Sequence, residues 1–295
     1  MKTISILGGT GFVGTELIGH LSKEKININV YTRNLNKANN FKVLPRVTLI
    51  QINESSNISD LLKGSDVVIN LVGILHETKS LKFSSAHTDW VKKIVAGIKK
   101  HNIGHFIHIG AMQSNRNAPS RYLKSKYDSE EQIRKGLKNR AWTIFRPSII
   151  YGENDKFINL FKKMVVYLPI VFLVSPKTKF QPIFVRDLVD IIIQSINDKK
   201  SYGKIYNIAG PKTYSLLEIV KLIAAENKRK VLIIPLGRIL SYMMVRVIEV
   251  LPYKIITRDN LMSMELDNVT DVNDSYCFKS NLRALPNYLQ ASKVI

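Results

Sequence analysis

The sequence is poor in cysteine and in acidic residues. Its single cysteine, Cys277, cannot form an internal disulfide, which suits a reducing compartment. Asp and Glu number 23 against 44 Lys and Arg, so the formal net charge is +21 at pH 7. Such an excess of positive charge can bind nucleic acid, anionic lipid or an acidic protein partner. The chain is rich in Lys, Ile and Asn throughout, so the excess can also result from the nucleotide composition of the genome. Because no base-stacking or nucleic-acid-binding motif accompanies the charge, nucleic-acid binding is not expected.

The chain also lacks an apolar run long enough to span a bilayer, which takes roughly 20 residues. The run from Met164 to Val174 is about half that length and contains Pro169. The run from Ile233 to Leu251 is interrupted by Arg238 and Arg246, a pattern typical of an amphipathic helix that is buried or lies at an interface. The first apolar run starts so close to the N-terminus that no signal or transit peptide is expected.

Glycines cluster at one place near the N-terminus. The apolar run from Ile4 to Leu7 predicts a buried strand, and a helical pattern follows Gly14. The intervening glycines fit two spacings, Gly9-x-Gly11-x-x-Gly14 and Gly8-x-x-Gly11-x-x-Gly14, both typical of a strand–turn–helix that binds a dinucleotide pyrophosphate. One glycine makes the tight turn, one admits the phosphates to the backbone, and one lets the helix pack close to the strand. The helix N-terminus then offers free N–H groups and a partial positive charge to the anion.

Strand and helix patterns alternate along the first half of the chain. Apolar runs without period-two alternation are typical of strands that are covered on both faces. The expected strands span residues 4–7, 28–32, 47–52, 65–73, 105–110 and 143–147. The alternation predicts an α/β fold with a Rossmann-type doubly wound parallel sheet. Residues 1–150 would form this core, and residues 151–295 a smaller C-terminal α/β substrate or docking region, from which one strand and helix near 180–210 return to the core.

The end of the second expected strand bears on the choice of cofactor. NAD-binding folds carry an acidic residue there for the adenosine ribose, whereas this chain reads Tyr31-Thr32-Arg33-Asn34. A guanidinium at Arg33 suits a 2′-phosphate by charge and by bidentate geometry. The sequence therefore favours NADP(H) over NAD(H), unless Arg33 is simply solvated.

Tyr122 and Lys126 lie four residues apart in a segment that leads into a helix, so they share one face of it. An ammonium beside a phenol favours the phenolate and can lower the pKa of the tyrosine from roughly 10 toward neutrality. A tyrosine tuned in this way can exchange a proton with a hydroxyl or carbonyl during hydride transfer. Tyr122 and Lys126 are therefore the candidate catalytic pair.

Other ionisable residues give weaker signals. Asp187 is expected to cap the helix that follows it. A core or surface role is expected for five histidines that lack metal-ligand spacing, namely His76, His87, His101, His105 and His108. No metal site is therefore expected.

Four motifs occur together in this chain: Gly-Gly-Thr-Gly-Phe-Val-Gly from Gly8, Tyr122-x-x-x-Lys126, Arg146-Pro-Ser-Ile-Ile-Tyr-Gly152 and Pro182-Ile-Phe-Val-Arg-Asp-Leu188. Their combination resembles the extended and atypical short-chain dehydrogenase/reductases. Further motifs are Asn70-Leu-Val-Gly-Ile74, Tyr206-Asn-Ile-Ala-Gly-Pro211, Thr257-Arg-Asp-Asn-Leu261 and Asp267-Asn268. With these, the chain looks most like the NAD(P)H-binding accessory subunit of respiratory complex I and its bacterial relatives.

The resemblance implies a role for each matching residue. The residues that would hold the pyrophosphate are Gly8, Thr10, Gly11, Phe12, Val13 and Gly14. The adenosine 2′-phosphate would meet Arg33, and the adenosine side would be lined by Leu71, Val72 and Gly73. The residue near the nicotinamide would be Pro147, with the ribose and reacting centre met by Tyr122 and Lys126.

The chain departs from the active members of this superfamily at one position. Those members carry a Ser or Thr just after the fifth strand, whereas this chain has Ala111 and no hydroxyl before Ser114. The similar complex I subunits also lack a complete site, and their cofactor is thought to be structural. The resemblance thus implies an accessory or assembly factor of complex I with a structural NADPH. The alternative is an active NAD(P)-dependent oxidoreductase, epimerase or dehydratase that uses Tyr122 and Lys126.

The C-terminal part is expected to dock onto a larger partner. The segment from Ile205 to Asn260 carries nine Lys or Arg against four Asp or Glu. Together with the resemblance, this favours complex I or its assembly intermediates as the partner, with peripheral contact to an anionic membrane. The rival role for this part is a substrate-binding lid. The expected location is the cytoplasm, extending to the inner face of the inner membrane, or the matrix side in a mitochondrion.

Overall fold

The computed structural model describes residues 1–249 and 256–291, which form two compact units. Unit 1 comprises Met1–Ala111, Ser125–Arg146 and Leu188–Tyr206. Unit 2 comprises Met112–Lys124, Pro147–Asp187 and Asn207–Ile295. The chain therefore contributes three separate segments to each unit.

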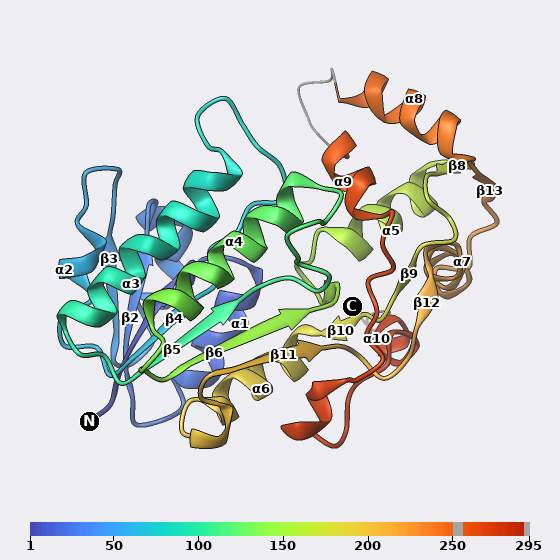
Figure 1. The fold of residues 1–295 in the computed structure, drawn as a ribbon. Helices are drawn as coiled ribbons and strands as arrows, with labels where there is room; N and C mark the ends of the chain where they lie inside the picture. The colour runs from blue at the N-terminus through green and yellow to red at the C-terminus, as the bar shows by residue number, and fades with distance from the viewer. Residues whose placement is uncertain (250–255, 292–295) are drawn as a thin grey trace. The chain divides into compact units, whose positions relative to one another are not determined.

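Unit 1 is built on a seven-stranded sheet (Figure 1). Its order is β11-β6-β5-β4-β1-β2-β3, and the neighbours from β6 to β3 pair in parallel. The strands are β1 (Thr3–Leu7), β2 (Asn27–Thr32), β3 (Val47–Gln51), β4 (Val67–Asn70), β5 (His105–Ile109), β6 (Trp142–Pro147) and β11 (Lys204–Ile208). The order 3-2-1-4-5-6 of the first six strands is that of a doubly wound Rossmann sheet, so the predicted fold class is confirmed.

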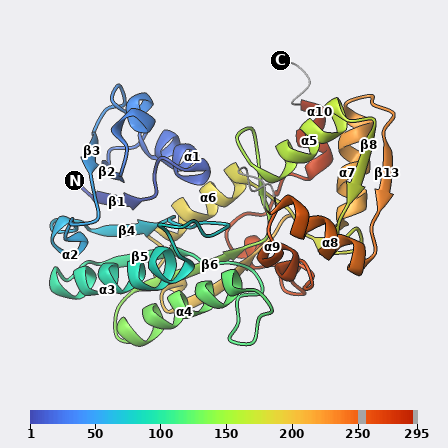
Figure 2. The ribbon, with the colours of Figure 1, turned by 90° about the horizontal axis from the view of Figure 1, so that it is seen from above.

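Helices cover both faces of this sheet. Figures 1 and 2 show α2 (Ile58–Leu61), α3 (Trp90–Lys100) and α4 (Arg121–Gly136) over one face, with α1 (Phe12–Leu21) and α6 (Val185–Ser195) over the other. Because both faces are covered, β1 and β4 are apolar and buried over nearly their whole length.

Helix α3 shows why these elements form where they do. Its apolar side chains Val91, Ile94, Val95 and Ile98 recur at helical spacing and are buried, while four lysines occupy the other face. At Gly97 the helix passes so close to α2 that an added Cβ would lie 2.9 Å from the Cα of Ser59.

Two predicted elements differ from the observed ones. The strand expected over residues 65–73 is shorter, because the side chain of Asn70 accepts the N–H of Val72 at 3.3 Å and the chain leaves the sheet there. The helical spacing of Trp90, Ile94 and Ile98 predicts a helix over residues 86–100, but an irregular π-helical turn, η2 (Ser84–Asp89), occupies its start and α3 begins only at Trp90. A second irregular helix, the 3₁₀ helix η1 (Leu35–Phe41), follows β2.

Unit 2 contains short strands and helices. Its paired strands are β7 (Ile150–Tyr151) with β10 (Ile183–Phe184), β9 (Lys179–Phe180) with β12 (Tyr214–Ser215), and β8 (Ile170–Leu173) with β13 (Leu232–Pro235). Its helices are α5 (Phe157–Tyr167), α7 (Leu216–Glu226), α8 (Arg238–Ile248), α9 (Arg258–Ser263) and α10 (Leu285–Ala291). Short irregular turns complete the chain, η3 (Lys199–Ser201) in unit 1 and η4 (Asp274–Cys277) in unit 2.

Asp187 in unit 2 does not have the expected role. It lies in the first turn of α6, but its carboxylate accepts the backbone N–H of Arg283 at 2.7 Å and pairs with Lys279 at 3.1 Å. The predicted cap is therefore wrong, because a distant segment of the chain satisfies this carboxylate.

The amphipathic stretch expected over residues 233–251 is divided between β13 and α8, and residues 250 and 251 lie outside the described part. Within residues 1–249 and 256–291, no helix combines the length and apolar character that crossing a bilayer requires.

Candidate functional site

The glycine-rich turn lies between β1 and α1, and Gly8 and Gly14 in it are sterically required. Gly8 has φ +83°, and its carbonyl accepts the N–H of Gly11 at 3.1 Å to close the turn. A Cβ on Gly8 would lie 2.9 Å from the backbone N of Val72, and a Cβ on Gly14 would lie 2.5 Å from the carbonyl oxygen of Gly9. The turn and the close packing of helix against strand thus have the geometry that the glycine spacing predicts.

The N-terminus of α1 is open. Its N-cap residue is Gly11, so no side chain caps the first turn, and that turn contains no acidic residue. Thr10, Phe12 and Val13 are half-buried beside the exposed Gly11. The first backbone N–H groups of the helix, with the positive end of its dipole, are therefore free to bind an anion.

Arg33 lies at the same edge of the sheet. Leu7 and Tyr31 are register partners in β1 and β2, so the two strands end side by side. Arg33 follows β2 with its side chain exposed, and Asn34 next to it accepts the N–H of Asn36 to start η1. A cationic side chain thus lies at the strand end where a dinucleotide would place its adenosine.

The segment Leu71–Gly73 passes over the glycine-rich turn. The N–H of Leu71 donates to the carbonyl of Leu7 at 2.9 Å, which extends the pairing of β4 with β1 by one residue. Because Val72 is the closest neighbour of a Cβ placed on Gly8, this segment and the turn lie in van der Waals contact. The predicted adenosine-side and pyrophosphate residues are therefore brought together within unit 1.

Lys126 is buried in unit 1 near that segment. Its Nζ donates to the backbone carbonyl of Ile109 at 2.8 Å and would lie 3.5 Å from a Cβ on Gly73. Burial lowers the pKa of Lys126 to about 8, although the nearby carboxylate of Glu130 opposes the shift. A buried ammonium with a lowered pKa beside the exposed Gly73 is typical of a functional site.

A polar network around Lys126 was not predicted from the sequence. Nε2 of His87 accepts the N–H of Ile74 at 3.1 Å, and Nδ1 of His87 lies 2.8 Å from the Oγ of Ser125. Beside it, Nδ2 of Asn70 lies 3.0 Å from Nδ1 of His108. The partners His87 and Ser125 are 38 residues apart in sequence, so no local spacing signals their contact.

Tyr122 lies in the first turn of α4, within unit 2. The carboxylate of Asp259, from α9, accepts the backbone N–H groups of Arg121 and Tyr122 at 2.7 and 3.0 Å and so caps this helix. Burial raises the pKa of Tyr122 to about 12. The expected lowering of this pKa is therefore wrong for the protein without ligand, because desolvation of the phenolate is the dominant effect.

Tyr122 and Lys126 belong to one continuous helix with the expected one-turn spacing, although the boundary between the two units falls between them. Pro147 is the last residue of β6 and belongs to unit 2, where its carbonyl accepts the N–H of Met112 at 3.2 Å. Ala111, which brings no hydroxyl to the end of β5, is buried. The catalytic roles of Tyr122 and Lys126 and the place of Pro147 beside the nicotinamide stay predictions.

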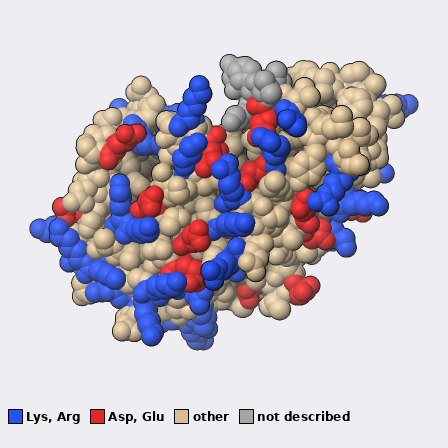
Figure 3. Space-filling view, turned by 45° about the horizontal axis from the view of Figure 1, so that its top comes forward, with Lys and Arg blue, Asp and Glu red and all other residues tan. Residues whose placement is uncertain are grey.

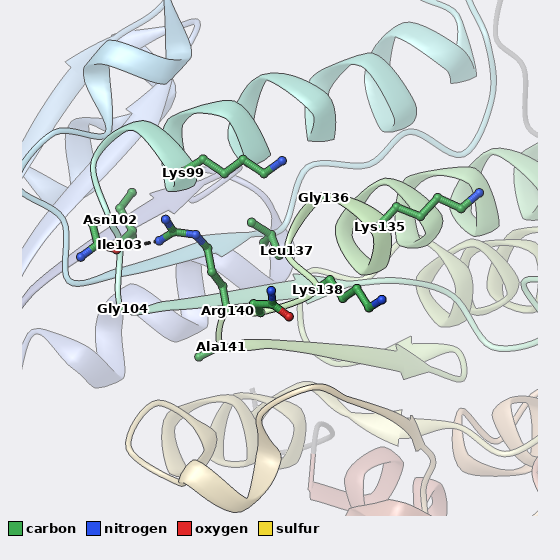
Figure 4. A pocket seen from close by; sticks show the side chains of 11 residues that line it. Lys99, Asn102, Ile103, Gly104, Lys135, Gly136, Leu137, Lys138, Arg140 and Ala141 are labelled. Atoms are coloured by element: carbon green, nitrogen blue, oxygen red, sulfur yellow. Dashed lines mark hydrogen bonds between the residues drawn. The ribbon is translucent and has the colours of Figure 1, made fainter.

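A hollow of about 710 Å³ lies elsewhere on unit 1 (Figure 4). It opens where β5 and β6 begin, at the ends of the strands opposite the glycine-rich turn. In its lining, the guanidinium of Arg140 donates to the side-chain oxygen of Asn102 at 2.8 Å. Its cations include Lys99 and Lys135, which lie in the last turns of α3 and α4, where lysines offset the helix dipole. None of the predicted site residues lines this hollow.

Comparison with known proteins shows the family and the fold to which this chain belongs. The model of the NmrA-like family matches residues 1–287. Among curated proteins, the chain is 28% identical over 225 residues to the mitochondrial NADH dehydrogenase [ubiquinone] 1 alpha subcomplex subunit 9 of Dictyostelium discoideum, covering 74% of this chain and 62% of that protein. The chain spans about three fifths of the length of the first such relatives that it matches.

Solved structures share the fold. An NADPH-dependent quinone oxidoreductase from Escherichia coli, complexed with NADPH, superposes with a TM-score of 0.80 at 14% identity, covering 98% of this chain and 99% of that one. A nucleoside-diphosphate-sugar epimerase from Staphylococcus aureus gives 0.77 at 17% identity, covering 98% and 100%. The expected resemblance to complex I accessory subunits and to reductases and epimerases of this fold is thus confirmed, and the chain belongs to the NmrA-like family.

Proposed function

We propose that this protein binds a nicotinamide dinucleotide at the edge of unit 1 where β1, β2 and β4 end. The observation that carries the proposal is the glycine-rich turn, in which Gly8 and Gly14 leave no room for a side chain and α1 presents an uncapped N-terminus. The pyrophosphate would bind the N–H groups of residues 8–14, with Leu71–Gly73 beside the adenosine and Lys126 at the ribose. A dinucleotide supplies two phosphate charges, and unit 1 offers an exposed helix N-terminus to receive them.

The bound form is proposed to be NADP(H) rather than NAD(H). Arg33 provides an exposed guanidinium where an NAD-binding fold would carry a carboxylate, and none of the residues Tyr31–Asn34 is acidic. A guanidinium can bind a 2′-phosphate through two parallel hydrogen bonds, and it gives a plain ribose hydroxyl no comparable advantage.

The cofactor is proposed to be structural. In the protein without ligand, burial raises the pKa of Tyr122 to about 12, so this phenol is a poor proton donor or acceptor near neutral pH. Ala111, two residues after the end of β5, has no hydroxyl to hold a substrate oxygen. The second candidate is an oxidoreductase, epimerase or dehydratase in which Tyr122 is the acid or base and Lys126 supports it, and the fold shared with such enzymes favours it.

The decisive experiment is native purification followed by identification of the nucleotide that accompanies the protein. The expected result is stoichiometric NADP(H) whose redox state does not change over time or on addition of carbonyl or sugar-nucleotide compounds. Recovery of NAD(H) would contradict the preference, and steady turnover would replace the structural role with the enzymatic one. A protein that neither carries nor binds a nicotinamide nucleotide would overturn the proposal.

The partner proposed for this protein is respiratory complex I or an intermediate of its assembly. The support is the similarity to proteins named as subunits of this enzyme in several eukaryotes. The match spans part of those subunits, so the partner is inferred for this chain and needs its own test.

Unit 2 has an unusual concentration of exposed apolar side chains that suits docking near a membrane. Of the fifteen large apolar side chains that are exposed in the described part of the chain, nine lie at the end of α5 and on β8, β13 and α8. We call them the apolar surface, and they are Tyr167, Leu168, Ile170, Phe172, Leu232, Ile239, Leu240, Met243 and Val247. Figures 1 and 2 show α8 next to β8 and β13, and exposed apolar clusters of this kind mark interaction sites.

Exposed cations accompany the apolar surface. Lys163, Arg229, Lys230 and Arg246 are exposed, and in the described part of the chain no ion pair engages them. Nearby, Glu249 and Glu265 are already paired with Arg258 and Arg238. The upper right of Figure 3 is a broad area with few charged side chains, and charged side chains lie at its margin. Apolar side chains flanked by cations favour the surface of an anionic bilayer, and we place the protein peripherally on the inner face of the inner membrane.

Cell fractionation at low and high salt, combined with pull-down of a tagged copy, tests this docking. Exposed charges are screened over about 8 Å at physiological ionic strength, so membrane association should weaken as salt is added. Co-purification of complex I subunits is expected. A protein found only in the soluble fraction at low salt, with no respiratory subunit bound, would contradict both proposed partners, complex I and the membrane. The second candidate, an oxidoreductase, epimerase or dehydratase, would then remain.

A further inference from the structure

The segment that follows β4 is fixed by a histidine that no cofactor motif includes. His87 lies in the π-helical turn η2 and is almost completely buried. Its Nε2 accepts the N–H of Ile74 at 3.1 Å, one residue beyond the predicted adenosine-side segment Leu71–Gly73. On its other side, Nδ1 of His87 meets the Oγ of Ser125 at 2.8 Å, next to Lys126 in α4. The imidazole therefore bridges the loop after β4 and the helix that carries the buried ammonium.

The protonation state of this histidine is defined by its contacts. Burial and the nearby ammonium of Lys126 lower the pKa of His87 to about 3, so the ring is neutral at physiological pH. An Nε2 that accepts a backbone N–H carries no proton, so the proton is on Nδ1, which donates to Ser125. Each ring nitrogen thus has one defined partner.

The bridge sets the position of Gly73. A Cβ on Gly73 would lie 3.5 Å from Nζ of Lys126 and 3.8 Å from Nε2 of His87. On the other side of the same segment, Val72 contacts the backbone of Gly8. A small shift of Ile74 would therefore move the segment relative to both the glycine-rich turn and the ammonium.

We propose that His87 is a positioning residue for the dinucleotide, which acts by hydrogen-bonding Ile74 so that Leu71–Gly73 is held between the glycine-rich turn and Lys126. The inference rests on the proposed nucleotide binding and adds a residue to it. His87 does not touch the cofactor. Its effect is preorganisation, since a loop already fixed in its bound conformation loses less freedom when the ligand binds.

Two conservative variants separate this role from general packing. In His87→Gln the side-chain oxygen can reach the position of Nε2 and accept from Ile74, whereas the shorter side chain of His87→Asn can replace only Nδ1. We expect His87→Asn to weaken NADPH binding by about tenfold, the scale of one lost buried hydrogen bond, and His87→Gln to stay within about threefold of the wild-type protein.

A second buried histidine provides the matched control. His105 in β5 is buried in the same unit and bonds Thr143 at 2.9 Å, but it lies where the strand begins, away from the glycine-rich turn. His105→Asn should lower the melting temperature of the nucleotide-free protein about as much as His87→Asn does, and leave the dissociation constant for NADPH unchanged. Equal NADPH affinity in His87→Asn and the wild type would overturn the proposal, as would equal losses in the Asn and Gln variants.

Amide hydrogen exchange tests the hydrogen bond between Ile74 and His87 in the wild-type protein. This test does not depend on whether a variant folds. In the wild-type protein without nucleotide, the N–H of Ile74 should be protected, because it is already bonded to His87. Rapid exchange that slows only after NADPH is added would show that the loop is ordered by the ligand, and would overturn the proposal. If the wild-type protein bound no nicotinamide nucleotide, the proposed function itself would fail, and the role of His87 with it.

Discussion

The ammonium of Lys126 donates a hydrogen bond to the backbone carbonyl of Ile109 at 2.8 Å, in an interior where it is only 4% exposed. A single neutral acceptor does not replace the water that a lysine loses on burial, which is why its pKa falls to about 8. The site thus keeps a cation whose burial costs stability, as is common where function needs a charge.

Replacing this lysine should stabilise the protein without ligand. The pKa of Lys126 falls from its ordinary 10.5 to about 8, so between these values the unfolded chain binds more protons than the folded one and stability rises with pH. Lys126→Met should lack that rise and be more stable near pH 7 by up to roughly 3 kcal/mol, less the lost bond to Ile109. Urea unfolding at pH 7 and pH 10 measures both effects. Lys99→Met, at an exposed position, is the control and should keep the wild-type pH dependence.

Alanine substitutions at two glycines of α1 should have opposite effects on the stability of the protein. Gly14→Ala places a methyl group 2.5 Å from the carbonyl oxygen of Gly9, so the turn must deform at a cost of about 1–3 kcal/mol and nucleotide binding should be lost. Gly19→Ala has no neighbour within 4 Å and should stabilise the helix by up to about 1 kcal/mol with binding intact. Thermal melting and NADPH titration check both. Normal binding by Gly14→Ala would show that the nucleotide does not use this turn.

Arg33 should decide between the two nicotinamide cofactors. Arg33→Asp removes the guanidinium and supplies the carboxylate that suits a ribose diol, so NADPH affinity should fall roughly ten- to a hundredfold while NADH affinity rises. Lys37→Asp makes the same change of charge nearby, on the exposed side of η1, and should affect the two cofactors equally. Isothermal titration with both nucleotides gives the ratio, and an unchanged ratio in Arg33→Asp would remove the basis for NADP(H).

Tyr122 distinguishes the enzymatic candidate from the structural one. Tyr122→Phe removes only the hydroxyl, so it should spare cofactor binding and, if the protein turns over a substrate, reduce the rate by roughly 10² or more. Tyr127→Phe, on the same helix, should leave any rate unchanged. Full activity of Tyr122→Phe would exclude proton transfer by this residue. Undetectable turnover in the wild-type protein on carbonyl and sugar-nucleotide compounds would support the structural cofactor.

The apolar surface should mediate lipid binding. Met243 and Val247 are 60% and 72% exposed on α8, so changing both to Glu should alter stability by no more than about 0.5 kcal/mol each yet abolish flotation with anionic vesicles. Val43→Glu, at an 84% exposed position in unit 1, is the control and should float normally. Binding of the wild-type protein to these vesicles should persist in part at high salt, because salt does not screen the burial of apolar side chains. Flotation of the double variant at wild-type levels would place the lipid contact elsewhere.

The glycine-rich turn and the individual strands of the sheet could be predicted from the sequence, because each leaves a pattern in neighbouring residues. The order of Gly8, Gly11 and Gly14 is informative, since Gly8 has a positive φ and Gly14 lies against the backbone of Gly9, where the turn leaves no room for a Cβ. The apolar runs of β1 and β4 are similarly sufficient, because a strand covered on both faces needs no polar alternation.

The pKa values and the long-range hydrogen bonds of the candidate site were decided only by the tertiary structure. Desolvation raises the pKa of Tyr122 and lowers that of Lys126, and helical spacing does not reveal either effect. Asp259 caps α4 from 138 residues away, and His87 holds Ile74 while meeting Ser125 from 38 residues away. The glycine-rich turn is closed by contacts among its own residues, such as the bond from Gly11 to Gly8 and the packing of Gly14 on Gly9. Hydration, capping, bridging hydrogen bonds and the packing of Val72 on Gly8 depend instead on which distant segments of the chain come into contact.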